Sequence, residues 1–226
     1  MIISIDGPAG SGKSTVADLI SEKLGFIHLN SGSLYRGIAA HMLTMHDSCE
    51  NLTEEDFENI HLSIKFIDNA QHVFVNDIDY TSVLRNNEVS KNSALVGTKK
   101  TVRKIVDECQ RSFAKNNNIV IEGRDVGSFV FPNAEFKFYL DCNSRVRAER
   151  RFKEEQLKKT NITLEEIENE IIKRDEIDRN RKIAPLVIPK NAIILDSTHL
   201  SALEVANKML EIISNNLQYF TSSAKI

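Results

Sequence analysis

The chain has 226 residues, of which 41% are hydrophobic and 27% charged, a balance typical of a folded globular protein with one sizeable core. Its formal net charge of −3 argues against broad binding to nucleic acid or to a membrane surface, so the positive charge that a phosphate ligand needs must be gathered locally. No apolar stretch approaches the roughly 20 residues of a transmembrane helix, and Cys49, Cys109 and Cys142 have no metal-ligand spacing, which predicts a cytoplasmic protein with reduced thiols.

The N-terminal residues predict a strand, a glycine-rich loop and a helix in succession. Residues 2–5 form a short β-branched run, and glycines and a proline follow between Gly7 and Gly12. Apolar residues then recur at helical spacing from Val16 to Leu24, and Gly25 is suited to end that helix. A second buried strand is expected over residues 26–29.

The same alternation of short apolar runs and helices continues further along the chain. Residues 119–121, 136–140 and 192–195 predict three more strands, and a capping box from Ser201 to Glu204 opens the last helix. This order predicts an α/β fold of the P-loop NTPase type, a parallel five-stranded sheet with helices on both faces. Right-handed crossovers then bring the carboxyl ends of the strands to one edge, where ligands bind.

Two segments interrupt this pattern. Residues 61–93 alternate between apolar and polar side chains, as at Ile64, Phe66, Val73 and Val75, which predicts a small antiparallel insertion. Residues 147–182 are highly charged and helical, with a capping box that begins at Thr163, and they are expected to form a short lid. The core domain is then expected to comprise residues 1–60, 94–146 and 183–226.

The glycine loop fits the pattern G-x-x-x-x-G-K-[ST] from Gly7 to Ser14. Backbone N–H groups in such a loop approach phosphate oxygens closely, and the N-terminus of the following helix adds donors and a favourable dipole. A chance glycine turn is the alternative, but the leading strand and the following helix favour a phosphate loop. A GTPase would also need a guanine-reading N-K-x-D element, and the sequence has none. The residues expected to bind ATP are Gly7, Pro8, Ala9, Gly10, Ser11, Gly12, Lys13, Ser14 and Thr15, with Lys13 at the β- and γ-phosphates and Ser14 as a ligand of Mg²⁺.

Arginines follow two of the predicted strands at the edge where ligands bind. Arg36 falls in the first turn of a helix that Ser33 is expected to begin, where a guanidinium can grip a phosphate with two hydrogen bonds. A capped helix with a solvated arginine is the alternative. Arg124 and Asp125 follow the strand at residues 119–121, and an ordinary ion pair is the alternative reading there.

The charged segment carries two aligned groups on helical faces. Arg147, Arg150 and Arg151 are spaced three and four residues apart, and few acidic residues lie near them in sequence. Arg174, Asp178 and Arg181 follow at similar spacing. A salt-bridged face in solvent is the alternative. We favour an arginine-lined lid, because transfer from ATP to an acceptor must exclude water and stabilise the transferring phosphoryl group.

Four stretches together resemble the family of bacterial cytidylate kinases, in order and at family spacing over nearly the whole chain. They are Ile5-Asp-Gly-Pro-Ala-Gly-Ser-Gly-Lys-Ser-Thr15; Ser31-Gly32-x-x-Tyr35-Arg36; Gly123-Arg124-Asp125-Val126-Gly127 with Val130-Phe131-Pro132; and Arg174-Asp175-x-x-Asp178-Arg179-Asn180-Arg181 with Ala184-Pro185-Leu186. The last two are far more specific than the glycine loop. The sequence departs from the family at Asn30, which is usually an aspartate. Some members have a base-contacting serine in or near the stretch that Ser93 and Ala94 occupy here, so that contact is expected to be shifted or lost.

The resemblance implies the fold of nucleoside monophosphate kinases, with a nucleotide-binding insertion at 61–93 and a lid at 147–182. It implies that Ser31, Arg103 and Asp125 help to read cytosine and that Arg174 and Asp178 contact the ribose. It further implies that Arg36, Arg124 and Arg181 grip the acceptor phosphate. The residues expected to act in catalysis are Lys13, Arg124, Arg147, Arg151 and Arg181.

The expected reaction is reversible transfer of the γ-phosphate of ATP, with Mg²⁺, to CMP or dCMP, giving ADP and CDP or dCDP. The expected partners are these small nucleotides, with no nucleic acid or membrane, and the expected state is a monomer. Two alternatives stay open. One is a kinase for another acceptor, such as UMP, another nucleotide or a shikimate-like metabolite, and the other is a regulatory module that binds ATP without transferring phosphate.

Overall fold

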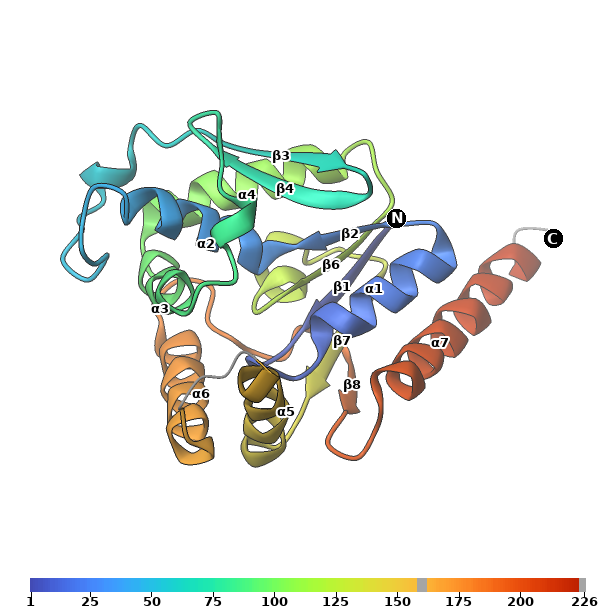
Figure 1. The fold of residues 1–226 in the computed structure, drawn as a ribbon. Coiled ribbons are helices and arrows are strands. Elements are labelled where there is room, and N and C mark those ends of the chain that lie inside the picture. Colours follow the sequence, from blue (N-terminus) through green and yellow to red (C-terminus); the bar gives the residue numbers. More distant parts are fainter. Residues whose placement is uncertain (158–161, 224–226) are drawn as a thin grey trace.

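A five-stranded parallel sheet forms the centre of the computed structural model, which describes residues 1–157 and 162–223 (Figure 1). The strand order is β2-β6-β1-β7-β8, so the predicted parallel five-stranded sheet is confirmed. None of the helices in these two ranges has the length and apolar character needed to cross a membrane. The strands are β1 (Ile2–Asp6), β2 (Ile27–Asn30), β6 (Ile119–Gly123), β7 (Phe136–Asp141) and β8 (Ile193–Asp196).

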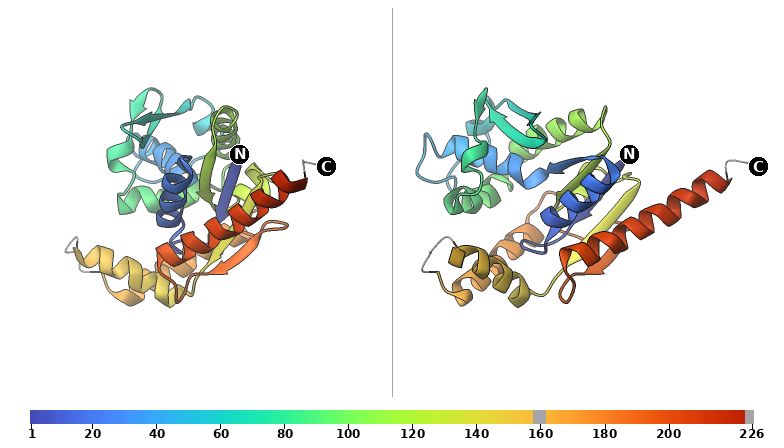
Figure 2. Two further views of the ribbon diagram at one scale, coloured as in Figure 1. Left: turned by 90° about the vertical axis from the view of Figure 1, so that its right-hand side faces the viewer. Right: turned by 45° about the vertical axis from the view of Figure 1, so that its right-hand side comes forward.

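Helices cover both faces of this sheet, because alternate side chains of its central strands are apolar on each side. Ile3 and Ile5 of β1 pack with Phe138 against α1 (Lys13–Leu24) and α7 (Ala202–Ser223). The opposite face, with Ile119 and Ile121 of β6, packs near the end of α4 (Lys100–Ala114). The turned views show α1 and α7 on the same side of the sheet (Figure 2).

A second sheet forms within the predicted insertion. It is antiparallel, with order β3-β4-β5, and consists of β3 (Leu62–Ile67), β4 (Ala70–Val75) and β5 (Ile78–Asp79). It packs on α2 (Ser31–Met42) through Val73 and Val75 of β4 and on α4 through β3, beside α3 (Asn87–Val96). The boundary predicted at 93/94 falls inside α3, because α3 shares a hydrophobic core with α2 and α4 as well as with the insertion.

The docking of β4 on α2 depends on a close approach at Gly37. A Cβ at this position would lie 2.5 Å from Val73 Cγ1. Gly37→Ala is therefore expected to lower the free energy of unfolding by about 1–2 kcal/mol, although alanine is ordinarily the better helix former by about 1 kcal/mol. Urea unfolding measures the change. Adding Val73→Ala should restore part of the loss, and a stabilised Gly37→Ala variant would show that β4 does not pack here.

The charged segment forms two helices that pack against each other at the carboxyl edge of the sheet (Figure 1). These are α5 (Ser144–Leu157) and α6 (Leu164–Asn180). The capping box predicted at Thr163 is present, since its hydroxyl accepts from Glu166 N and the Glu166 carboxylate accepts from Thr163 N. Residues 158–161 of the predicted lid lie outside the described residues.

Candidate active site

The glycine loop leads from β1 into α1 with three glycines in conformations that other residues rarely adopt. The φ angles are 149° at Gly7, 75° at Gly10 and 92° at Gly12, and a Cβ on Gly7 would collide with the carbonyl of Leu140. Gly12 is the N-cap of α1, so no side chain caps the helix, and no acidic residue stands in its first turn. The helix N-terminus therefore suits an anion.

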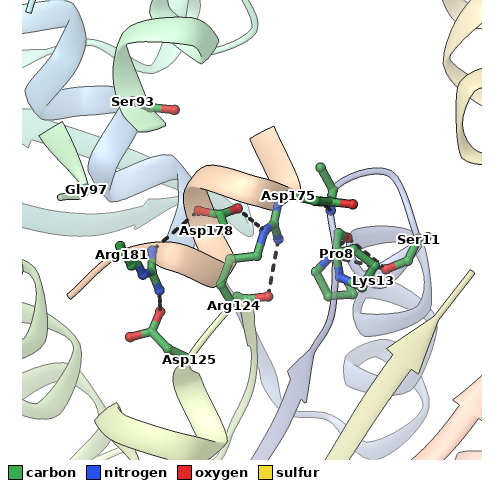
Figure 3. Close-up of polar contacts among 12 residues, drawn as sticks. Pro8, Ser11, Lys13, Ser93, Gly97, Arg124, Asp125, Asp175, Asp178 and Arg181 are labelled. Carbon is green, nitrogen blue, oxygen red and sulfur yellow. Dashed lines mark hydrogen bonds and ion pairs between the residues drawn. The ribbon is translucent and has the colours of Figure 1, made fainter. Parts of the chain in front are cut away.

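Lys13 lies inside this loop rather than in solvent. Its Nζ donates to Pro8 O at 2.6 Å and to Ser11 Oγ at 3.2 Å (Figure 3). Burial, together with the positive charge of Arg124, lowers the pKa of Lys13 to about 7. A negative ligand at the loop would reverse this effect, because an anion favours the charged form of the lysine.

Asp6, at the end of β1, holds the turn that follows β6. Its two carboxylate oxygens accept from Val126 N at 2.8 Å and from Gly127 N at 2.7 Å. Burial raises the pKa of Asp6 to about 7, against the lowering effect of these two hydrogen bonds. The turn carries Arg124 and Asp125, so Asp6 fixes the backbone on which these two side chains stand.

Asn30, at the end of β2, links the glycine loop to the first turn of α2. Its Nδ2 donates to Glu122 Oε1 at 2.6 Å and lies 3.4 Å from Ser14 Oγ. Its Oδ1 accepts from Ser33 N at 2.9 Å and from Arg36 Nη2 at 3.3 Å. The expectation that Ser33 begins this helix is wrong, because Asn30 caps it and the helix starts at Ser31.

A chain of buried ion pairs runs from α4 to the turn after β6 and on to α6. Figure 3 shows its part from Asp125 through Arg181 and Asp178 to Arg124. Arg103 pairs with Asp125, which also pairs with Arg181 at 2.8 Å. Arg181 lies 3.5 Å from Asp178, which accepts from Arg124 Nε at 3.0 Å. Arg124 therefore does form an ion pair, as the alternative interpretation expected. Its partner, however, lies on α6, and the pair stands at the wall of a cleft and not in solvent.

Three guanidiniums of this region have a buried Nε without a hydrogen-bond partner among the described residues, those of Arg36, Arg103 and Arg174. Burial, together with the positive charge of nearby Arg124, lowers the pKa of Arg174 to about 10. Burial also lowers the pKa of Arg36, with Arg124 again contributing. Converging buried positive charges are unfavourable unless an anion joins them, which indicates a phosphate site.

The arginines of α5 were expected to have few acidic partners, but two of them form ion pairs. Arg147 is buried and pairs with Asp175 at 2.7 Å, and Arg151 lies 3.7 Å from Glu170. Both partners lie on α6, across the helical pair, which is why their proximity is not visible in the sequence near 147–151. Arg150 donates to Ser197 O at 2.6 Å, in the connection between β8 and α7.

These side chains surround one cleft with a volume of about 1690 Å³ at the carboxyl edge of the sheet. Ser31, Asp125, Asp178 and Ser93 also contribute to its wall. Arg103 lies behind the wall, where it also donates to Gly97 O and lies 5.6 Å from the ring of Tyr35. Arg147 lies behind the glycine loop. The loop residues and arginines that line the cleft are Ala9, Gly10, Ser11, Gly12, Lys13, Ser14, Thr15, Arg36, Arg85, Arg124, Arg150, Arg151, Arg174 and Arg181.

Several residues that shape this cleft were not predicted as site residues. Gln71 of β4 accepts from Asn30 N at 2.7 Å and donates to Asn30 O at 3.2 Å, tying the insertion to the edge strand β2. Nothing in the sequence near Gln71 marks this contact. Asp6 and Asp175 are next in sequence to the predicted site residues Gly7 and Arg174. Their place in these motifs is the sequence signal that could have identified them. The others are Glu122 and Arg85.

The oxygen ligands that could hold a Mg²⁺ ion are few. No group of three or more His, Cys, Asp or Glu side chains within residues 1–157 and 162–223 is arranged to hold a metal. The Ser14 hydroxyl is exposed to the cleft, and Asn30 joins it to Glu122. These residues fit a Mg²⁺ ion that is held mainly by nucleotide phosphates, since Mg²⁺ usually takes only one or two protein ligands there.

Comparisons with known proteins identify the same family over nearly the whole chain. A family model described as cytidylate kinase matches residues 3–215. The chain is 39% identical over 215 residues to a cytidylate kinase of Thermotoga maritima, covering 95% of this chain and 97% of the relative. It is 40% identical over 220 residues to a cytidylate kinase of Carboxydothermus hydrogenoformans, covering 94% of this chain and 97% of the relative. A solved structure of a protein from Eubacterium ventriosum, 11% identical with a TM-score of 0.52, covers 95% of this chain and 98% of that chain and shows likeness of fold alone.

Proposed function

The chain belongs to the cytidylate kinase family, and on that premise we propose that it transfers the γ-phosphate of ATP to CMP or dCMP, giving ADP and CDP or dCDP. It is a nucleoside monophosphate kinase, a phosphotransferase with a phosphate as acceptor. We further propose that it acts in the cytoplasm as a monomer on these small nucleotides, without a nucleic-acid or membrane partner. One chain supplies both the phosphate loop and the arginines of the cleft.

A single observation carries the proposal beyond the family. Arginines from α2, from the turn after β6 and from α6 line the same cleft as a phosphate-binding loop. The loop and the helix N-terminus suit a polyphosphate. Arg36, whose Nε group has no partner among the described residues, suits a second phosphate. Two phosphate sites in one cleft are what transfer between two nucleotides requires.

The acceptor is already an anion, so the transfer needs no general base. Catalysis would come from in-line positioning and from stabilisation of charge on the transferring group. In this proposal Lys13 contacts the β- and γ-phosphates of ATP. Arg36, Arg124 and Arg181 hold the acceptor phosphate, and Arg151 reaches the transferring group from α5.

The acceptor nucleoside is proposed to lie between the insertion and α6. Asp125 and the buried Arg103 behind it would recognise the cytosine base, with Ser31 at the end of β2. Arg174 and Asp178 would contact the ribose. Ser93 also lines this part of the cleft, and it is suited to a base contact at the position where the sequence departs from some family members.

Mg²⁺ is proposed to accompany ATP, with Ser14 as its protein ligand. A bound Mg²⁺ would neutralise charge on the β- and γ-phosphates and help to orient them. Asn30 and Glu122 would hold the Ser14 side of the site through their hydrogen bonds. The amide of Asn30 is compatible with the neighbouring Glu122 carboxylate, whereas a second carboxylate at this position would repel it.

An acceptor panel tests the proposed function. ADP release is coupled to an indicator reaction and measured with CMP, dCMP, UMP, AMP and shikimate as acceptors, and without any acceptor. The expected result is preference for CMP or dCMP. Preference for UMP or AMP would contradict cytosine recognition, and preference for shikimate would indicate another kind of kinase. Binding of ATP without any acceptor-dependent ADP release would indicate a regulatory module.

ATP binding is expected to take up a proton at pH 8 and much less at pH 6. The pKa of Lys13, about 7 in the buried loop, leaves the amine largely neutral at pH 8, and the phosphates of ATP would raise it. At pH 6 the amine is already charged before ATP binds. Calorimetric titration at each pH, in buffers of different ionisation enthalpy, measures the uptake. Lys13→Met should abolish the uptake at pH 8, and uptake that persists in this variant would assign the proton to another group.

A further inference from the structure

One residue of the glycine loop is bound through both of its backbone polar groups. Ala9 N donates to Asp175 Oδ1 at 3.2 Å, and Ala9 O accepts from Arg147 Nη1 at 2.8 Å. The same Nη1 lies 2.7 Å from Asp175 Oδ2, so Ala9 and the two side chains form a closed ring of contacts. The Arg147 and Asp175 side chains are 5% and 4% exposed, which keeps water from competing for these bonds.

The two side chains of this ring come from the two helices of the predicted lid. Arg147 stands near the start of α5, where its Nε also donates to Cys142 O at 3.0 Å at the end of β7. Asp175 stands on α6, next in sequence to Arg174 and less than one helical turn before Asp178. In Figure 3, Asp175 lies between Asp178 and the loop that carries Pro8 and Lys13.

Helix α6 therefore contacts both phosphate sites through adjacent positions. Asp175 binds the backbone of the glycine loop, where the donor is proposed to lie. Arg174 and Asp178 line the cleft where the acceptor is proposed to lie, and Asp178 pairs with Arg124 and Arg181. Because a helix is stiff over one turn, fixing Asp175 to Ala9 also fixes the distance between the loop and the acceptor-side arginines.

We propose that Asp175 and Arg147 are positioning residues that set the spacing between donor and acceptor, and that neither touches the reacting phosphates. The inference rests on the proposed function and revises one expectation in it. Arg147, expected from the sequence to act in catalysis, already binds Asp175, Ala9 O and Cys142 O and does not line the cleft. In-line transfer is sensitive to such spacing, since a misplacement of about 1 Å can cost roughly a hundredfold in rate.

A second ion pair between the same helices provides a matched control. Arg145 of α5 binds Glu168 of α6 at 2.8 Å, with side chains 48% and 22% exposed. This pair joins α5 to α6 as the first pair does, but among the described residues neither side chain hydrogen-bonds or ion-pairs with the glycine loop. Glu168→Gln therefore removes a lid ion pair and leaves the Ala9 contacts in place.

The test compares Asp175→Asn with Glu168→Gln in the full-length enzyme. Asparagine is close in shape to aspartate, but it keeps one acceptor oxygen and turns an NH₂ group toward one of the two donors. Asp175→Asn is expected to lower kcat for transfer by roughly tenfold to a hundredfold, with KM for CMP within about threefold. It is also expected to raise the share of ATP hydrolysed without transfer. Glu168→Gln is expected to change each quantity by less than about twofold.

A double variant tests whether the two side chains act as one unit. Asp175→Asn combined with Arg147→Gln should lose little more kcat than the worse single variant, because either change opens the same ring. Arg147→Lys, which keeps the charge but not the planar fork, should lose less than Arg147→Gln. It also serves as the test variant if Asp175→Asn does not fold, as judged by circular dichroism and melting temperature.

Three results would overturn the proposal. They are a kcat within twofold of wild type in Asp175→Asn or Arg147→Lys, a loss equal to that of Glu168→Gln, and additive losses in the double variant. A fall in activity that only follows a fall in the folded fraction would assign the pair to stability alone. Failure of the proposed function is distinguishable in wild type. Use of another acceptor would leave the same comparison of variants with that acceptor, whereas no acceptor-dependent ADP release would overturn the positioning proposal as well.

Discussion

Lys13→Ala is expected to lower kcat for CMP phosphorylation by at least about a hundredfold, the loss typical of removing one preorganised charge donor. The Lys13 amine lies in the loop between α1 and β1, within hydrogen-bond distance of Pro8 O and Ser11 Oγ. A bound polyphosphate would offer it a stronger partner than this carbonyl, because a hydrogen bond between opposite charges is about twice as strong as a neutral one.

The loss in Lys13→Ala should come without a loss of stability. Burial holds the pKa of Lys13 below its ordinary value, so the unfolded chain binds more protons at this group between about pH 7 and pH 10. The cost of burying the charged lysine therefore falls as the pH rises over that range, and the free energy of unfolding increases. Lys13→Ala should remove this increase. Initial rates at saturating CMP, together with melting curves across that pH range, test both statements.

A surface lysine provides the control for this prediction. Lys104 of α4 is 75% exposed and forms only a loose pair with Glu108 at 4.0 Å. Lys104→Ala is expected to change kcat by less than twofold. Near-normal turnover in Lys13→Ala would refute the role of this lysine in transfer, whatever the acceptor.

Arg36→Met is expected to lower kcat/KM for CMP by at least about a hundredfold and to leave KM for ATP within about twofold. Among the described residues, Arg36 Nε is buried without a hydrogen-bond partner, and the acceptors of Arg36 Nη2 are the neutral Asn30 Oδ1 and Ser33 Oγ. Two charge-assisted hydrogen bonds to a phosphate are worth about 3–6 kcal/mol, which exceeds the 2.8 kcal/mol that a hundredfold effect requires.

The measurement for Arg36→Met separates the two substrates. Initial rates are taken over a range of CMP at saturating ATP, and over a range of ATP at saturating CMP. Arg145→Met is the control, because Arg145 binds Glu168 outside the cleft. An equal rise in KM for ATP would move Arg36 to the donor site, and an unchanged kcat/KM for CMP would remove it from the acceptor site.

The sequence predicted the parts of the site that depend on residues close to one another in the chain. The glycine loop needs only its own spacing between a strand and a helix, and the structure has that context at Gly7–Ser14. The capping boxes at Thr163 and Ser201 are likewise local and are both present. The five strands were predicted for the same reason, because a short apolar run indicates a buried strand by itself.

Contacts between segments that are far apart in the chain could not be predicted from the sequence. A serine is a good N-cap, so the sequence predicts that α2 starts at Ser33, whereas Asn30 does the capping and also binds Glu122 on the neighbouring strand β6. The boundary of the insertion was set inside α3, because apolar alternation does not reveal which core a helix joins. The pairing of Gln71 with Asn30 has no sequence pattern at all.

By itself, the sequence determined the fold class, the phosphate loop and the family, since each depends on local spacing or on motifs in a fixed order. Only the tertiary structure decided which charges face the cleft and which are already paired. Arg147 shows the reason, because its partners include Ala9, a residue 138 positions away, and burial between two helices commits its charge to that contact. The strength of a charge in a protein depends on the partners and the water around it, and folding sets both.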